Sequence, residues 1–190
     1  KIKKKMYKKF TLEDKKKFFT GLLNLIDGVQ FFIENDIIHY DIKGGNIVYN
    51  IHTGTAKFID FGLANKISVV IEKCKKDKNW LAISHGYYPK ESSCMKRTDF
   101  FFSIKPHCQK LRKAYQNNYD GFIKQATHSF DMYSLCYALN DLFEQLSSVE
   151  GMSNIYNFLN EAIVLLRDYY LFPLNYRKTN PAELKKELKE

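Results

Sequence analysis

The 190-residue sequence lacks any apolar run long enough to cross a membrane and any recognisable secretory leader. Its apolar stretches are interrupted every few residues by Lys, Asp, Asn or Glu, whereas a spanning helix needs about 20 apolar residues in succession. With 45% hydrophobic and 27% charged residues, the chain can bury one core of ordinary size. We therefore expect one intracellular, cytoplasmic domain that makes no membrane contact.

Cysteine is also sparse, and no CxxC pair occurs. Four cysteines are few for a disulfide scaffold, which favours a reducing compartment. Their spacing relative to His85 and His107 fits no standard zinc site, so metal binding there is the minority interpretation. The cysteines are Cys74, Cys94, Cys108 and Cys136.

Arginine accounts for only four of the 30 cationic residues. Because the arginine fork suits phosphates and base edges better than lysine does, this scarcity disfavours nucleic acid as a partner. The net charge of +9 is also concentrated at one end, since residues 1–17 carry +7 of it. We expect a solvated, lysine-rich stub at 1–10.

The periodicity of apolar residues predicts a mainly α-helical (α+β) fold. Thr11 and Asp14 form a capping-box pattern before a four-three-four-three apolar repeat, which predicts a helix over 12–34. Short apolar runs separated by turn residues predict strands near 37–38, 47–49 and 56–59. Further helices are expected over 132–146, over 155–166 and from Asn180-Pro181 to the C-terminus.

Four polar residues on adjoining loops carry the chemical signal: Asp41, Lys43, Asn46 and Asp60. Two carboxylates, an amide and an ammonium suit phosphoryl transfer, in which positioning and charge neutralisation supply most of the catalysis. Asp41 can accept the proton of a substrate hydroxyl, and Lys43 can offset charge on the moving phosphoryl group. Asn46 and Asp60 can hold Mg²⁺ that bridges the nucleotide phosphates.

The segment from His39 to Asn46, HYDIKGGN, resembles the catalytic loop H-R-D-L-x-x-x-N of eukaryotic-type protein kinases, and Asp60-Phe61-Gly62 matches their D-F-G. Gly86 to Glu91 is similar to the A-P-E segment. The resemblance implies that His39 packs against D-F-G, that Asp131 ties down the catalytic loop from a central helix, and that Arg177 pairs with Glu91.

The sequence departs from the usual protein kinase pattern in ways that bear on regulation, substrate class and fold. Tyr40 stands where most members have Arg, so control by activation-loop phosphorylation is not expected. The Asp-x-Lys pattern at Asp41 and Lys43 favours serine/threonine kinases over tyrosine kinases and over small-molecule phosphotransferases. The gap between Glu91 and Asp131 is several times the usual one, which predicts an irregular, partly helical insertion at 92–129.

No G-x-G occurs in the sequence, because none of its nine glycines lies two residues from another. A kinase small lobe needs such a phosphate loop, and the eleven residues before the first helix are too few for that lobe. We therefore expect residues 11–190 to be a kinase C-lobe without its N-lobe, from a truncated or split kinase. The abundant residue types Lys, Asn, Ile, Phe and Tyr have A/T-rich codons, which suits the genome of a large DNA virus or of an A/T-rich protist. If the source is a virus, the host cytoplasm is the expected location.

The resemblance implies a serine/threonine protein kinase that uses ATP and Mg²⁺ on a protein substrate, together with a separately encoded or truncated N-lobe. The activity of this chain alone stays open. The first alternative is a pseudokinase-like scaffold that uses 92–129 to hold a partner. The second is a small-molecule or lipid phosphotransferase.

Overall fold

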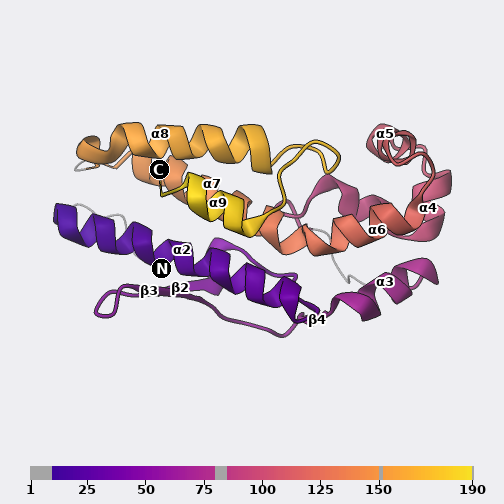
Figure 1. Cartoon of the computed structure of the whole chain (residues 1–190), viewed down its shortest axis with the longest axis horizontal. Helices are drawn as coiled ribbons and strands as arrows, with labels where there is room; N and C mark the ends of the chain where they lie inside the picture. Colours follow the sequence, from indigo (N-terminus) through magenta and orange to yellow (C-terminus); the bar gives the residue numbers. More distant parts are fainter. Residues whose placement is uncertain (1–9, 80–84, 150–151, 190) are drawn as a thin grey trace.

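The computed structural model describes residues 10–79, 85–149 and 152–189, and it consists mainly of helices with two short antiparallel sheets (Figure 1). The predicted mainly helical architecture with short strands is confirmed. The stub at 1–10 lies, apart from Phe10, outside the described residues. In chain order the elements are α2 (Leu12–Glu34), β1 (Ile37–Ile38), η1 (Gly44–Asn46), β2 (Ile47–Asn50), β3 (Thr55–Phe58), β4 (Asn65–Lys66), α3 (Ile67–Lys75), η2 (Lys90–Cys94), α4 (Arg97–Phe102), α5 (Pro106–Ala114), α6 (Tyr119–His128), α7 (Phe130–Ser147), η3 (Ser153–Ile155), α8 (Tyr156–Leu165), η4 (Leu166–Tyr170) and α9 (Pro181–Glu187).

Helix α2 spans the residues that the sequence predicts. The Thr11 hydroxyl accepts a 3.1 Å hydrogen bond from the Asp14 N–H, and the Asp14 carboxylate accepts one of 2.9 Å from the Thr11 N–H. These reciprocal bonds form the capping box and fix the start of the helix. The buried face of α2 packs against β3, α7 and α9 and includes Phe18, Leu22, Leu25, Val29 and Phe32.

The two sheets hold the polar loops side by side. Strands β2 and β3 pair antiparallel with Ile47 opposite Phe58, and β1 pairs with β4 through Ile38 and Asn65. The loop from β1 to β2 and the loop from β3 to β4 therefore leave paired strands at the same place. Strand β4 is not predicted from the sequence, because an Asn-Lys dipeptide carries no strand signal.

Buried side chains form two hydrophobic clusters, and α7 contributes to both. The first cluster lies among α2, α7, α8 and α9, and it includes Met132 and Leu135 of α7. The second lies among α3, η2, α4, α5 and α6, and it includes Phe130 from the first turn of α7. Helix α7 is thus the element against which both halves of the molecule pack.

The C-terminal helices follow the prediction with two differences. The helix expected over 155–166 is α8, preceded by the 3-10 turn η3 and continued by η4, a single π-helical turn. Asn180 caps α9 by accepting hydrogen bonds from the N–H groups of Ala182 and Glu183, with Pro181 at the first helical position. Helix α9 ends at Glu187 instead of running to the C-terminus.

Segment 92–129 is more regular than the predicted irregular insertion. It contains α4, α5 and α6, which Figure 1 shows at the end of the long axis away from α8. Phe100 and Phe122 of these helices are fully buried, and their rings stack at 4.8 Å. The helices have six to ten residues each, too short for a clear apolar periodicity, which explains the weak sequence signal.

A disulfide joins Cys94 in η2 to Cys108 in α5. The cysteine count, which favours a reducing compartment, does not anticipate this bond. Cys74 and Cys136 are free and buried. Among the described residues, no helix combines the length and the apolar character needed to cross a membrane.

Candidate active site

The loop between β1 and β2 brings three of the predicted residues together, and we call Asp41, Lys43 and Asn46 the Asp41 cluster. The Lys43 ammonium donates to both Asp41 carboxylate oxygens at 2.8 and 2.7 Å. The Asn46 amide donates to Asp41 Oδ2 at 2.6 Å and to the Asp41 backbone oxygen at 3.0 Å. The carboxylate is therefore fixed in position by charged and neutral donors at once.

The surroundings of Asp41 keep its side chain ionised. Burial raises its pKa, but hydrogen bonds from Lys43, Tyr87 and Asn46 outweigh burial, and the pKa lies below the ordinary value. Ionised Asp41 therefore stabilises the fold above its unfolded pKa, and this contribution is lost as the pH falls through the lower folded pKa. At neutral pH the group is an anion that can accept a proton.

Asp60 lies beside this cluster on the loop that follows β3. The N–H of Ile59 donates a 3.0 Å hydrogen bond to the backbone oxygen of Asn46, which joins the two loops one residue before Asp60. Asp60 is exposed and has a left-handed backbone with φ of 63°. Such a conformation is costly for a non-glycine residue and is concentrated at functional sites.

The oxygens of Asn46 and Asp60 fit a divalent cation that prefers hard donors. The Asn46 amide nitrogen is used in bonds to Asp41, so its carbonyl oxygen is the atom that could bind a metal. The Asp60 carboxylate is exposed. Carboxylate and amide oxygens are the protein ligands that Mg²⁺ takes beside nucleotide phosphates, so these two residues suit that ion.

Two buried side chains, His39 and Asp131, connect the loop that carries Asp41 to Phe61 and to helix α7. His39 is fully buried, and its ring centroid lies 4.6 Å from that of Phe61 in the D-F-G triplet. Asp131, in the first turn of α7, accepts hydrogen bonds of 2.6 and 3.0 Å from the N–H groups of His39 and Tyr40. The central helix is thus bonded directly to the loop that carries Asp41.

The Asp131 contact leads to a pH-dependent prediction. Burial raises the pKa of Asp131 to about 7, although the two N–H donors act against that rise. Because the folded pKa lies above the unfolded value near 3.8, the protonated form of Asp131 stabilises the fold. This stabilisation is complete below the unfolded pKa and is lost as the pH rises through about 7. Raising the pH from 5 to 7 should therefore lower the free energy of unfolding by about 2–3 kcal/mol through this group.

Asp131→Asn should remove this part of the pH dependence. Urea denaturation at pH 5 and pH 7 measures the difference between variant and wild type. Asp141→Asn changes an exposed carboxylate of the same helix and should leave the wild-type pH dependence in place. Equal pH dependence in the Asp131 variant and in wild type would contradict the prediction.

Tyr40 belongs to the core and is not a surface contact for a phosphorylated loop. Its side chain is 2% exposed, and its ring meets that of Phe130 edge-on at 5.1 Å. Its backbone is left-handed, with φ of 67°. The residue that replaces the usual Arg therefore connects the catalytic loop to the second hydrophobic cluster by packing.

Glu91 and Arg177 meet as a buried ion pair, 86 residues apart in sequence. Arg177 also donates a 3.0 Å hydrogen bond to the Ser129 hydroxyl, and its guanidinium lies 4.8 Å from the centre of the Tyr133 ring. The pair joins η2 to the segment before α9 and to the start of α7.

Tyr87 is the site residue that sequence reasoning misses. Its hydroxyl donates a hydrogen bond to Asp41 Oδ1, and Lys43 lies 5.7 Å from its ring centre. The two bonded residues are 46 positions apart, and no spacing rule links a tyrosine of the A-P-E-like segment to the catalytic loop. Tyr87 therefore occupies one acceptor position of the proposed base.

Tyr87→Phe should raise the pKa of Asp41, because it removes one of the hydrogen bonds that hold this pKa low. NMR titration of the carboxyl carbon of Asp41 measures the change directly. Tyr176→Phe alters a tyrosine that is 77% exposed and should leave the titration unchanged. An Asp41 pKa that is the same in Tyr87→Phe and in wild type would show that the contact is not made in solution.

Two carboxylates, an ammonium and an amide on adjoining loops are the groups that a phosphotransferase uses. Residues 2–98 match the family model of the protein kinase domain. The match covers half of the chain, so the chain belongs to the protein kinase family. The matched range contains both polar loops and Glu91, and it ends inside segment 92–129.

Short segments of the chain are similar to curated kinases. Mitogen-activated protein kinase kinase kinase 15 of Mus musculus is 36% identical over 52 residues, which are 27% of this chain and 4% of that protein. Mitogen-activated protein kinase kinase kinase 5 of Homo sapiens and that of Mus musculus are each 34% identical over 44 residues, which are 23% of this chain and 3% of those proteins. The chain thus spans only a small part of these relatives. No solved structure matches it.

Proposed function

We propose that this chain is the large lobe of a serine/threonine protein kinase, which transfers the γ-phosphoryl group of ATP to a protein hydroxyl when a small lobe is present. The observation that carries the proposal is the Asp41 cluster, in which one carboxylate is held by the Lys43 ammonium and the Asn46 amide. A protein that used this surface only for binding would not need that combination beside Asp60.

Each residue of the site has a distinct role in the proposed reaction. Asp41 accepts the proton of the substrate hydroxyl. As it does so, the hydroxyl oxygen forms a bond to the γ-phosphorus, and the bond between the γ-phosphorus and the oxygen that bridges it to the β-phosphate breaks. Lys43 lies next to Asp41 and stabilises negative charge on the transferred group. Asn46 and Asp60 would hold Mg²⁺ through their oxygens and so orient the nucleotide. Bound Mg-ATP would supply the phosphoryl group, and its Mg²⁺ would offset negative charge on the phosphates.

The proposal includes a second segment that covers the nucleotide. The sequence contains no G-x-G loop, so a Gly-rich roof has to come from elsewhere, either from another part of a longer protein or from a separate chain. Protein substrates and serine/threonine specificity rest on Lys43 two residues after Asp41 and on the partial similarity to the mitogen-activated protein kinase kinase kinases.

Phosphate incorporation tests the proposal. The protein in which this chain occurs, with its small lobe, should transfer radiolabelled phosphate from Mg-ATP to serine or threonine of a generic basic protein. Asp60→Asn should abolish transfer, whereas Asp168→Asn, which changes an exposed carboxylate of η4, should not. Full activity of the Asp60 variant would overturn the assignment of the metal ligands.

A scaffold function is the second candidate, and the Tyr87 contact favours it. The Tyr87 hydroxyl donates a hydrogen bond to Asp41 Oδ1, so this carboxylate oxygen is not free to accept one from a substrate hydroxyl. Folded full-length protein that lacks transferase activity both as wild type and as Tyr87→Phe would favour this candidate. Activity that rises in Tyr87→Phe would favour a kinase held back by its own tyrosine.

A further inference from the structure

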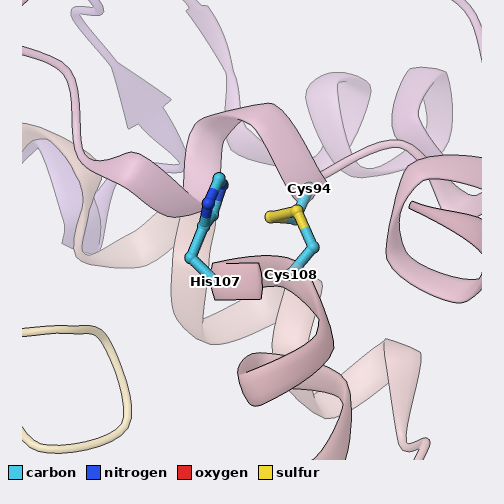
Figure 2. A group of neighbouring side chains, drawn as sticks. All are labelled: Cys94, His107 and Cys108. Atoms are coloured by element: carbon cyan, nitrogen blue, oxygen red, sulfur yellow. A yellow bond between two sulfur atoms is a disulfide. The ribbon is translucent and has the colours of Figure 1, made fainter. Parts of the chain in front are cut away.

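Two cysteines and a histidine meet where the 3-10 helix η2 contacts α5. Cys94 ends η2, and His107 and Cys108 lie in the first turn of α5. Their ligand atoms lie within 4.8 Å of one another. Figure 2 shows the His107 imidazole beside the two sulfurs of Cys94 and Cys108, which are joined as a disulfide. Sequence spacing alone disfavours a metal here, but the fold brings the three donors together.

We call Cys94, His107 and Cys108 the Cys–His–Cys site, and its donor atoms suit a thiophilic metal. Two thiolates and an imidazole are the donor set that Zn²⁺ selects, with a fourth position left for water or a hydroxyl. Both sulfurs are fully buried, and the Ser93 hydroxyl lies 2.8 Å from His107 Nε2 and 3.8 Å from Cys94 Sγ. An oxygen that can orient the imidazole or complete a four-coordinate site is therefore already in place.

Cys108 lies in the first turn of helix α5, directly after His107, so α5 supplies two of the three donors and η2 supplies the third. Cys74 and Cys136 are free and buried, and neither belongs to the group formed by Cys94, His107 and Cys108.

We propose that the Cys–His–Cys site has two states: reduced, it binds one Zn²⁺ through Cys94, His107 and Cys108, and oxidised, it forms the Cys94–Cys108 disulfide and releases the ion. With glutathione disulfide as the oxidant, the two thiolates lose two electrons, one protein S–S bond forms, and the glutathione S–S bond breaks to give two glutathione thiolates. The site therefore either holds a zinc ion or is oxidised to the disulfide by a disulfide-class oxidant, and it cannot be in both states at once.

The location gives each state a structural consequence. Cys94 follows Glu91 by three residues in the same 3-10 helix, and Glu91 forms the buried pair with Arg177. Either a zinc ion or a disulfide therefore links the insertion helix α5 to the segment that carries this pair. Reduced, metal-free protein lacks that link.

Metal titration of the reduced protein tests the proposal. Protein kept reduced with a phosphine under argon should bind about one equivalent of Zn²⁺, and Co²⁺ should give the thiolate-to-cobalt absorption of a tetrahedral site. Adding glutathione disulfide should release the zinc as two thiols are lost. Reduced, folded protein that binds neither metal, or oxidised protein that retains zinc, would overturn the proposal.

Variants separate the two states. Cys94→Ala should abolish both zinc binding and disulfide formation, whereas His107→Gln should weaken zinc at least about tenfold and still permit the disulfide. His107 is only half-buried, so this variant should fold even where a cysteine variant does not. Cys74→Ala is the matched control and should retain one zinc per chain. Zinc affinity that is unchanged in His107→Gln would remove the histidine from the site and refute the proposed ligand set.

Discussion

Arg177→Ala is expected to lower the free energy of unfolding by about 3–5 kcal/mol, because it leaves the Glu91 carboxylate buried without its cation. The two side chains are 1% and 3% exposed, so water cannot replace the lost partner. The same change removes a hydrogen bond to Ser129 and a guanidinium that lies over the Tyr133 ring. Three elements lose a shared contact at once: η2, the start of α7 and the segment before α9.

Urea denaturation followed by circular dichroism measures this loss. Arg167→Ala is the matched control, because Arg167 pairs with Glu144 on the surface, where the side chains are 57% and 41% exposed. Exposed pairs contribute at most about 1 kcal/mol, so this variant should remain close to wild type. Glu91→Gln keeps an oxygen acceptor for Arg177, so its loss in the free energy of unfolding should lie between those of Arg177→Ala and Arg167→Ala. This variant tests the prediction even if Arg177→Ala does not fold. An Arg177→Ala cost similar to that of Arg167→Ala would contradict the prediction.

The sequence predicts the elements whose signals are local. Helix α2 is read from a capping box and a long apolar repeat, and the order of the two polar loops is read from Asp41, Asn46 and Asp60. These patterns fix backbone conformation and residue order within short windows, which is the range over which propensity and periodicity act.

The contacts that the sequence could not give are those made across the fold. Tyr87 donates a hydrogen bond to Asp41 across 46 residues, and Cys94 meets Cys108 because η2 packs against α5. The sequence around a tyrosine beside a Pro-x-Glu pattern does not indicate which residue that tyrosine will contact. The three short helices of 92–129 are similarly set by the burial of Phe100 and Phe122 against the rest of the chain.

The meeting of Glu91 and Arg177 lies between these two cases. Their pairing is expected from family resemblance, and nothing in their spacing of 86 residues would suggest it otherwise. The structure adds what resemblance cannot supply, namely the Ser129 hydroxyl and the Tyr133 ring that complete the surroundings of the guanidinium. Those neighbours come from the start of α7, the helix whose Asp131 also holds the catalytic loop.

Asp41→Asn is expected to lower the rate of phosphate incorporation by about 10²- to 10⁴-fold in the protein that contains this chain and a small lobe. The amide cannot accept the proton of a substrate hydroxyl, although it nearly matches the carboxylate in shape and can still accept hydrogen bonds from Lys43 and Asn46. The matched control is Asp36→Asn, five residues earlier in a left-handed turn that Asn tolerates well. It should retain wild-type activity.

The kinetic constants distinguish a base from a binding residue. Asp41 is proposed to act on the hydroxyl and not on the nucleotide, so kcat should fall in Asp41→Asn while KM for ATP stays close to wild type. Asp60→Asn, which is proposed to remove a metal ligand, should instead also change the dependence of the rate on Mg²⁺ concentration. If Asp41→Asn retained wild-type kcat, proton acceptance by Asp41 would be refuted, and the carboxylate would be left only with the structural role visible in its bonds to Lys43, Asn46 and Tyr87.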